Sequence, residues 1–393
     1  MATAQIPADE LALYDRQLRL WGVQAQQLIK KGHILIISMR ALGVEIAKNL
    51  TLAGIGSLTI IDDGLVTEED LGACYFLREE DIGKPRAESA IPRLLELNPR
   101  VDIKSGGSVA ALQVAEPTFF EDFTLVVACD LDFGTLSRIN AATRVAKRPF
   151  YAACIHGEFG FIFADLIDHG FVVERDSNVA VKSGTTESTT RTIVEVEQKT
   201  EPGRPQKQIV TKREIYCPLI LANSSPFDAS ITSSKRKLKN VPALLPALRA
   251  LFDFERDFGR HPDSSAGVDL ATFTASVKLH AQQLLLPDET LTADFLRSFI
   301  AALDAELPTT ASFIGSRLSE DVINAITHRE QPIQNFALFD SEAGPIYCLY
   351  SPPPEALLAP SSTVTNGTSG GIQLPETGSI KFPNASGQDS ITI

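Results

Sequence analysis

The sequence predicts an α/β fold built on a doubly wound, mostly parallel sheet. Short apolar runs alternate with helical patterns from residue 33 to residue 153. These runs are rich in β-branched residues, which is typical of parallel strands that are buried on both faces. The chain has 393 residues, of which 44% are hydrophobic, so it can bury a core of this size.

The first half of the chain contains the alternating elements. Gly54 is expected to end the first helix of the alternation in a C-cap position, and Pro85 is expected to open a later helix near its first turn. The expected strands are residues 33–38, 57–61, 101–104, 124–128 and 149–153. The expected helices are residues 42–53, residues 85–97 and a third helix between the last two strands. Right-handed crossovers between these strands place helices on both faces of the sheet.

The second half has a different organisation. Residues 157–176 alternate aromatic and polar positions, as antiparallel strands do, whereas residues 177–208 are rich in Ser, Thr, Glu and Lys and predict a mobile loop. Three helical patterns follow within residues 242–306. The last expected elements are a helix at residues 311–328 and strands at residues 336–339 and 346–350, which return to the sheet.

These patterns divide the chain into four parts. Residues 1–176 are expected to form the first part of the doubly wound domain, and residues 311–350 are expected to complete it. Residues 177–310 are expected to form the mobile loop and a helical insert. Residues 351–393 are rich in Pro, Ser, Thr, Gly and Asn, lack apolar periodicity and predict a disordered tail.

Composition excludes several classes of function. The net charge of −13 argues against nucleic acid as the main partner, because phosphate binding needs a basic surface. The sequence has no run of about 18 apolar residues, and its first residues lack the apolar core of a secretory signal, so no membrane contact is expected. The five cysteines are widely spaced and form no C-x-x-C pair. This spacing predicts reduced thiols in the nucleus or cytoplasm and no zinc site.

A nucleotide-binding loop would lie between the first strand and its helix, because backbone N–H groups at a helix N-terminus bind phosphates. Residues 38–43 read SMRALG, so only Gly43 remains of a G-x-G-x-x-G pattern, where it allows close packing of the helix. Arg40 occupies a position where even a Cβ would crowd a phosphate. Asp62 ends the second strand and has two interpretations: it holds a ribose hydroxyl, or it only opens a turn.

Four segments resemble the ubiquitin-activating enzyme superfamily, also called ThiF-like, which includes bacterial adenylyltransferases that act on sulfur-carrier proteins. Residues 14–22, YDRQLRLWG, are similar to its opening motif. Residues 82–88, IGKPRAE, are similar to its Gly-x-x-Lys-Ala-Glu helix start, and Asn98-Pro99 follows at the expected spacing. Residues 335–340, NFALFD, are similar to its closing strand. The resemblance covers most of the predicted sheet and implies a Rossmann-like adenylation fold.

The departures from this family imply a degenerate nucleotide site. Active members adenylate a C-terminal glycine with a glycine-rich loop, an Asn and Arg pair, a lysine and an aspartate near Mg²⁺. Here residues 70–74 read DLGAC in place of Asn-Leu-x-Arg-Gln, Arg86 stands at the lysine position, and Leu131 aligns with the aspartate. Only Gly43, Asp62 and Arg86 remain as vestiges, so no cofactor and no metal are expected on this chain, and ATP and Mg²⁺ are expected in a partner subunit.

Arg16, in the opening motif, is the one expected catalytic residue. The resemblance implies that this arginine reaches across a dimer interface into the partner's ATP site, where a guanidinium can stabilise charge on transferring phosphates. The residues alone allow another interpretation, in which Arg16 and Arg19 pair with acids on their own helix face.

The chain length and the strand at residues 161–166 resemble the SUMO branch of the heterodimeric enzymes more than the cullin-modifier branch, whose non-catalytic subunit is longer. This resemblance implies a non-catalytic subunit that supports adenylation of SUMO and thioester formation on a catalytic large subunit. It further implies that SUMO binds through that partner. One alternative is a self-sufficient homodimeric adenylyltransferase, in which Asp62 and Arg86 serve a repurposed site. The others are the regulatory subunit for the cullin modifier and a scaffold without a catalytic contribution.

Other candidate residues are expected to have ordinary roles. Cys217 lies where active relatives place their thioester cysteine, but Pro-Leu-Ile-Leu follows it and no cation is near, so a structural role is expected. The six histidines show no metal-binding spacing. Residues 235–239, KRKLK, are either a nuclear localisation patch or a solvated loop, and the expected location is the nucleus, with the cytoplasm as a second site.

Overall fold

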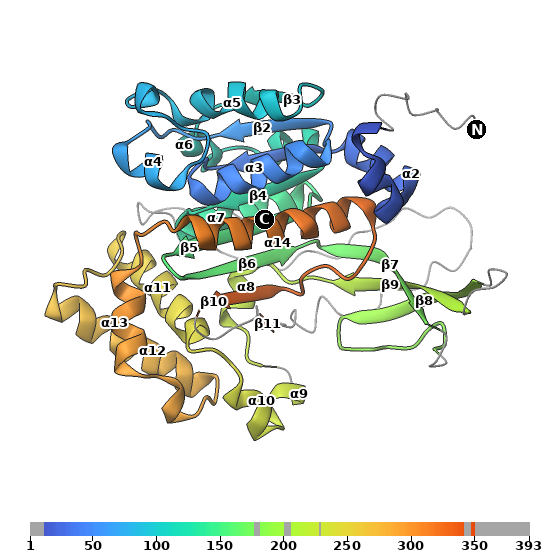
Figure 1. Cartoon of the computed structure of the whole chain (residues 1–393). Coiled ribbons are helices and arrows are strands. Elements are labelled where there is room, and N and C mark those ends of the chain that lie inside the picture. The colour runs from blue at the N-terminus through green and yellow to red at the C-terminus, as the bar shows by residue number, and fades with distance from the viewer. Residues whose placement is uncertain (1–11, 177–180, 200–205, 228, 342–346, 350–393) are drawn as a thin grey trace, which may run out of the picture. The chain divides into compact units, whose positions relative to one another are not determined.

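The centre of the protein is an eight-stranded sheet with the order β11-β10-β6-β5-β4-β1-β2-β3 (Figure 1). It is seen in a computed structural model that describes residues 12–176, 181–199, 206–227, 229–341 and 347–349. The strands of this sheet are β1 His33–Ile37, β2 Ser57–Ile61, β3 Asp102–Ser105, β4 Leu125–Cys129, β5 Phe150–His156, β6 Phe159–Asp165, β10 Phe336–Asp340 and β11 Tyr347–Leu349.

The strands β3, β2, β1, β4 and β5 are parallel, and their order is that of a doubly wound sheet. The predicted fold class is therefore confirmed. Beyond β5 the sheet continues with the antiparallel strands β6, β10 and β11, so the two strands expected near the end of the chain do return to the sheet. The chain changes direction between β1 and β4, and the carboxyl ends of these strands open a crevice there.

Helices cover both faces of the sheet. Alternate residues of β1 point to opposite faces: Ile34 and Ile36 belong to one apolar core, and Leu35 and Ile37 belong to the other. The first core is covered by α3 Ala41–Ala53, α5 Arg86–Leu97 and α14 Pro308–Thr327, and α14 packs along α3. The second core is covered by α7 Phe133–Val145 and α11 Leu244–Phe258.

The expected three helices within residues 242–306 are present as α11, α12 Gly267–Gln283 and α13 Ala293–Ala301. Their apolar faces share the second core with the sheet, because Phe252, Phe273 and Phe299 are buried together with Phe161. Shorter elements connect the rest of the chain. They are α4 Glu68–Ala73, α6 Val109–Leu112, α8 Leu219–Ser224, α9 Ala229–Thr232 and α10 Lys235–Lys239, with short 3₁₀ helices at Glu79–Asp81, Pro117–Asp122 and Asp288–Thr290.

The expectation of a mobile loop at residues 177–208 was wrong at residues 191–199 and 207–208, which form strands, whereas residues 181–190 form turns. Strands β7 Asp168–Asp176, β8 Arg191–Lys199 and β9 Lys207–Ile215 form a second, antiparallel sheet. Ile193 and Val210 are buried on one face of this sheet, while the other positions are largely polar. An antiparallel sheet tolerates such polar strands because one of its faces is solvated, so polar composition did not reveal the strands.

The N-terminal helix α2, Asp15–Lys31, is kinked at Gly22, which has a φ of 81°. It contacts α14 and lies at the end of α3, where Gly54 is the expected C-cap and adopts a left-handed conformation with a φ of 78°. None of the helices within the described ranges is both long and apolar enough to cross a membrane. The tail expected at residues 351–393 lies outside the described residues.

Candidate functional site

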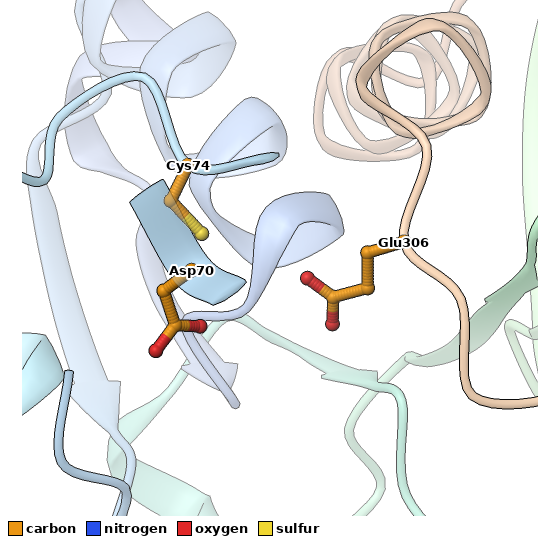
Figure 2. Close-up of side chains that lie close together, drawn as sticks. All are labelled: Asp70, Cys74 and Glu306. Atoms are coloured by element: carbon orange, nitrogen blue, oxygen red, sulfur yellow. The ribbon is translucent and has the colours of Figure 1, made fainter. Parts of the chain in front are cut away.

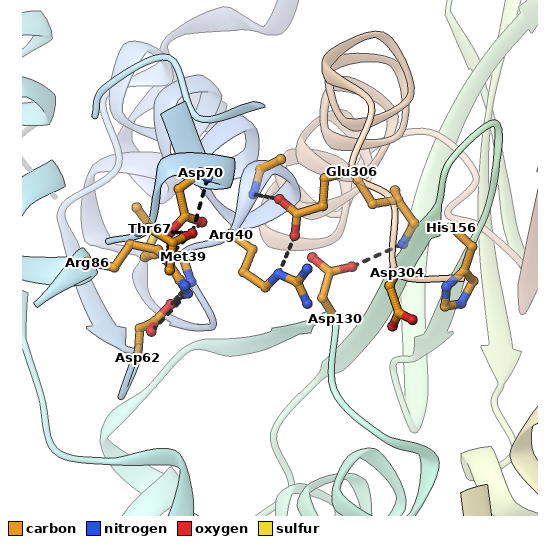
Figure 3. Close-up of polar contacts among 12 residues, drawn as sticks. Met39, Arg40, Asp62, Thr67, Asp70, Arg86, Asp130, His156, Asp304 and Glu306 are labelled. Atoms are coloured by element: carbon orange, nitrogen blue, oxygen red, sulfur yellow. Dashed lines mark hydrogen bonds and ion pairs between the residues drawn. The ribbon is translucent and has the colours of Figure 1, made fainter. Parts of the chain in front are cut away.

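The candidate site lies at the carboxyl ends of β1, β2 and β4 (Figure 3). The loop after β1 carries Arg40, β2 is followed directly by Asp62, and β4 is followed directly by Asp130. In a doubly wound sheet this is the edge where nucleotides bind, with the phosphates at the N-terminus of the helix after β1. The loop, Asp62 and the end of β4, which the sequence singled out separately, therefore lie at the same edge of the sheet.

Asp62, the residue that could hold a ribose hydroxyl, is bound by other groups of the protein. Both oxygens of Asp62 accept backbone hydrogen bonds, from the N–H of Gly64 at 2.6 Å and from the N–H of Met39 at 2.5 Å. Arg86 forms an ion pair with the same carboxylate at 3.0 Å and another with Asp70 at 3.3 Å. Burial acts to lower the pKa of Arg86, but the Asp62 and Asp70 carboxylates outweigh it and raise that pKa. Asp62 thus helps to form a turn, and its acceptor positions are filled from within the protein.

The N-terminus of α3, where a phosphate would bind, is occupied as well. The group there is a carboxylate that the sequence did not single out. Glu306 accepts a hydrogen bond from the N–H of Ala41, in the first turn of α3, at 3.2 Å and forms an ion pair with Arg40. Gly43 has its expected packing role, because a Cβ there would lie 2.0 Å from the carbonyl oxygen of Ser38. The positive end of the helix dipole therefore faces an internal anion in the place of a phosphate.

Asp130 and Glu306 bring two acidic groups close together at this edge. The Asp130 carboxylate accepts the N–H of Ile155 at 3.0 Å. Burial, and then the Glu306 carboxylate, raise the pKa of Asp130 to about 7. A cavity of about 70 Å³ lies beside them and is lined by both carboxylates and by Leu131, the residue aligned with the Mg²⁺ aspartate. The lining also includes Asp132, Glu255 and Asp304, with Arg40 as its one guanidinium, so the balance of charge does not favour a polyphosphate.

One group of possible metal ligands occurs among the described residues, and it is formed by Asp70, Cys74 and Glu306 (Figure 2). Their ligand atoms lie within 4.8 Å of one another. The Asp70 carboxylate already pairs with Arg86, and that of Glu306 pairs with Arg40. Burial, and then the Glu306 and Asp70 carboxylates, raise the pKa of Cys74 well above its usual value. These residues do not fit a cation, because the thiol stays protonated and each carboxylate already has a guanidinium.

Arg16 is exposed in the first turn of α2, and α2 contacts the C-terminal end of α3, whereas the candidate site lies at the N-terminal end of α3. Arg19 pairs with Asp15 on the same helix at 2.9 Å, as the alternative interpretation of the motif expected. Within the part of the chain that the structure describes, no hydrogen bond or ion pair involves the side chain of Arg16. The structure therefore separates the two arginines of the motif: one is paired locally and the other is presented to solvent.

The remaining candidates have structural positions. Cys217 is fully buried, and burial together with the Asp165 carboxylate raises the pKa of its thiol to about 12, so it is a poor nucleophile. The basic run Lys235–Lys239 forms the short helix α10 rather than a loop, with its four cations exposed.

Sequence reasoning missed Glu306 and the role of Asp70. A signal existed for Asp70, because Thr67 and Asp70 form a capping box whose spacing is visible in the sequence. Glu306 carries no such signal, since 265 positions separate it from Ala41 and its own neighbours form no motif.

The strand order and the crevice at its switch point define a doubly wound α/β protein of the type that binds nucleotides, and in this chain side chains of the protein itself fill that crevice. Residues 14–346 match the sequence model of the ThiF family, and the chain belongs to that family.

Similar proteins come from fungi and vertebrates. The chain is 33% identical over 351 residues to the DNA damage tolerance protein rad31 of Schizosaccharomyces pombe, which covers 89% of this chain and 100% of that protein. It is 32% identical over 345 residues to the DNA damage tolerance protein RHC31 of Saccharomyces cerevisiae, and this match covers 86% of this chain and 96% of that protein. It is 29% identical over 342 residues to SUMO-activating enzyme subunit 1 of Homo sapiens, with coverage of 86% and 94%.

Proposed function

We propose that this chain is the non-catalytic subunit of a heterodimeric, ATP-dependent SUMO-activating enzyme. Its membership of the ThiF family and its likeness to SUMO-activating enzyme subunit 1 over most of both chains support this function. One observation carries the proposal. Glu306 lies where a phosphate would bind at the N-terminus of α3, and Arg86 pairs with Asp62, the residue that would hold a ribose hydroxyl. This chain therefore needs a second subunit to bind ATP.

The partner is a catalytic large subunit. In this proposal it supplies the ATP contacts, the Mg²⁺ ligands and the cysteine that forms the thioester, and it also holds SUMO. The position of Cys217 supports this division of labour, because a fully buried thiol with a raised pKa cannot form a thioester readily. This chain then contributes the dimer interface and one catalytic side chain.

That side chain is Arg16, which acts in trans. Adenylation moves negative charge onto the leaving pyrophosphate, and a guanidinium fixed near this charge lowers the barrier. Arg16 is exposed on α2, whereas Arg19, the other arginine of the motif, already pairs with Asp15. An arginine in this state is available to the phosphates of a neighbouring subunit.

The self-sufficient homodimer is less well supported. A repurposed site would need Asp62 and Arg86 to face a ligand, but they bind each other at 3.0 Å. The side chain of Arg86 is 12% exposed and that of Asp62 is 4% exposed, so neither group offers a free contact surface.

The test is SUMO-dependent exchange of pyrophosphate into ATP, measured on the purified chain and on the heterodimer reconstituted with the large subunit. We expect no exchange by the chain alone. Arg16→Ala should lower exchange by the heterodimer by on the order of 10²–10³-fold, which is typical for one well-placed donor. Arg16→Lys should restore only part of the rate, because an ammonium lacks the planar fork.

The matched control is Arg19→Ala, which removes an exposed arginine from the same helix and should leave exchange close to that of the unmodified enzyme. Recovery of the heterodimer on a sizing column shows whether each variant still assembles. Exchange by the isolated chain would contradict the closed site. Normal exchange by an intact Arg16→Ala heterodimer would leave this chain as a scaffold.

We also propose a nuclear location, supported by the exposed cations of α10. A fluorescent fusion in which Lys235, Arg236, Lys237 and Lys239 are replaced by Ala should lose nuclear accumulation. Unchanged accumulation would exclude α10 as the signal.

A further inference from the structure

The residue that precedes α2 is fastened to two other segments. Tyr14 is buried, and its hydroxyl accepts a hydrogen bond from the Asn98 amide at 2.8 Å. The same amide donates to the carbonyl oxygen of Thr51 at 2.9 Å. The tyrosine ring lies against Gly54, where an added Cβ would come within 2.4 Å of the hydroxyl oxygen. Tyr14 therefore has one fixed position between the ends of α3 and α5.

Two glutamines of α2 attach the same helix to the end of α3. Gln17 donates to the carbonyl oxygen of Leu52 at 3.4 Å, and Gln26 donates to that of Ala53 at 3.1 Å. Together with the bond from Asn98 to Thr51, three consecutive carbonyls in the last turn of α3 accept side-chain amides. The last carbonyls of a helix need such partners, so these bonds fix α2 against α3.

The opening motif thus has two sides. Tyr14 and Gln17 are three positions apart and both reach towards α3, whereas Arg16 and Leu20 are exposed. A guanidinium lies roughly 8 Å from its helix axis, so a rotation of α2 by about 10° would displace it by more than about 1 Å. A misplacement of about 1 Å can lower a catalysed rate by on the order of 10²-fold.

We propose that Tyr14 and Asn98 are positioning residues that set the rotation of α2 and thereby aim Arg16 at the ATP site of the partner subunit. The inference rests on the function proposed above for Arg16. Neither residue touches ATP; each acts through the helix that carries the arginine. The link between the motif at residues 14–22 and Asn98, which is distant in sequence, is the hydrogen bond between them.

The experiment uses the reconstituted heterodimer with Tyr14→Phe or Asn98→Ala in this chain. Tyr14→Phe keeps the ring against Gly54 and removes only the hydroxyl, so it is the variant least able to disturb folding. We expect kcat for pyrophosphate exchange to fall by roughly 10- to 100-fold, with the KM for ATP within about twofold of its normal value and the heterodimer intact. In an Arg16→Ala heterodimer the same two substitutions should lower kcat no further.

The matched control is Asn140→Ala. Asn140 is also a buried asparagine, and it lies on the opposite face of the sheet from α2. Its side-chain NH2 donates to Asp165 at 2.8 Å, and its side-chain oxygen accepts the N–H of Leu219 at 2.8 Å. This variant should lower the melting temperature and leave kcat unchanged.

The outcomes separate the two proposals. An unchanged kcat in Tyr14→Phe and Asn98→Ala, or an equal fall with and without Arg16, would overturn the positioning role and leave the function of Arg16 standing. A normal rate in the intact Arg16→Ala heterodimer would overturn the function of Arg16 and this inference with it. Loss of kcat only where Arg16 is present supports the positioning role.

Discussion

Removing the Arg86 guanidinium provides a direct test of how the closed site contributes to stability. Arg86→Met keeps most of the side-chain volume and deletes the charge that faces Asp62 and Asp70, whose side chains are 4% and 6% exposed. Removing one partner of a buried ion pair costs about 3–5 kcal/mol, because the other charge stays buried. Asp62 keeps two backbone donors and Asp70 keeps the N–H of Thr67, so we expect the lower end, about 3 kcal/mol.

This free energy converts into a measurable shift. A unit of the size of Met1–Leu358 unfolds with an entropy of roughly 0.75 kcal/mol/K, so a loss of about 3 kcal/mol lowers the melting temperature by ~4 °C. Calorimetry and urea unfolding of the purified chain measure the change. The matched control is Arg297→Met, which breaks a surface pair whose side chains are 73% and 95% exposed and should cost less than about 0.5 kcal/mol.

A double variant decides whether the charge is the cause. Asp70→Asn added to Arg86→Met removes one of the two unpaired anions, and the amide oxygen still accepts the N–H of Thr67, so part of the lost stability should return. Asp62 is left unchanged, because both of its oxygens accept backbone N–H groups and an amide would turn an NH2 group towards one of them. A single variant no less stable than the surface control would refute the reasoning. A double variant less stable than Arg86→Met would also refute it, because the packing of these side chains would then matter more than their charges.

Three further predictions concern other parts of the chain. The folded-state pKa of Asp130, about 7, lies above the ordinary 3.8, so the folded protein binds more protons between these values and its stability falls as pH rises through them. Asp130→Asn should therefore reduce the stability difference between about pH 5 and pH 8 by roughly 2.5 kcal/mol in urea unfolding, and an unaltered difference would contradict the raised pKa. Cys217→Ala should leave the SUMO thioester band of the heterodimer intact on a non-reducing gel, because this thiol is buried; loss of the band from an assembled heterodimer would show otherwise. Deleting residues 351–393 should leave the melting temperature and activation unchanged, because the segment has little apolar surface to bury, and a clear fall in either would contradict this.

The doubly wound sheet could be predicted because short stretches of neighbouring residues identify its strands and helices. A run such as Ile34 to Ile37 is apolar at every position, which occurs where a strand is buried on both faces, and Gly54 marks the end of the next helix. The strands β8 and β9 were missed because they lack such a continuous apolar run. Their buried positions, such as Ile193 and Val210, are few, and the solvated face carries charges that are typical of a loop.

The site was predicted only in part. The departures at Arg40 and Leu131 predicted that a nucleotide would be poorly held, and such a prediction needs only single residues at known loop positions. The groups that fill the space could not be inferred. Arg86 was visible as a substitution for lysine, but its pairing with Asp62 depends on how α5 docks on β2. Glu306 reaches α3 only because the chain returns to the sheet after the helical insert.

The carboxylate of Glu306 also determines how the enzyme should respond to its own substrate. A ligand that binds the folded state stabilises it by RT ln(1 + [L]/Kd), so many nucleotide-binding proteins melt at temperatures that depend on ATP concentration. In this chain an internal anion already occupies the N-terminus of α3. The proposed function therefore predicts that the folding free energy of this chain does not depend on the ATP concentration. On the same proposal, we expect any rise in melting temperature on adding ATP to the assembled enzyme to report on the large subunit alone, and we expect titration to give one nucleotide for each pair of subunits.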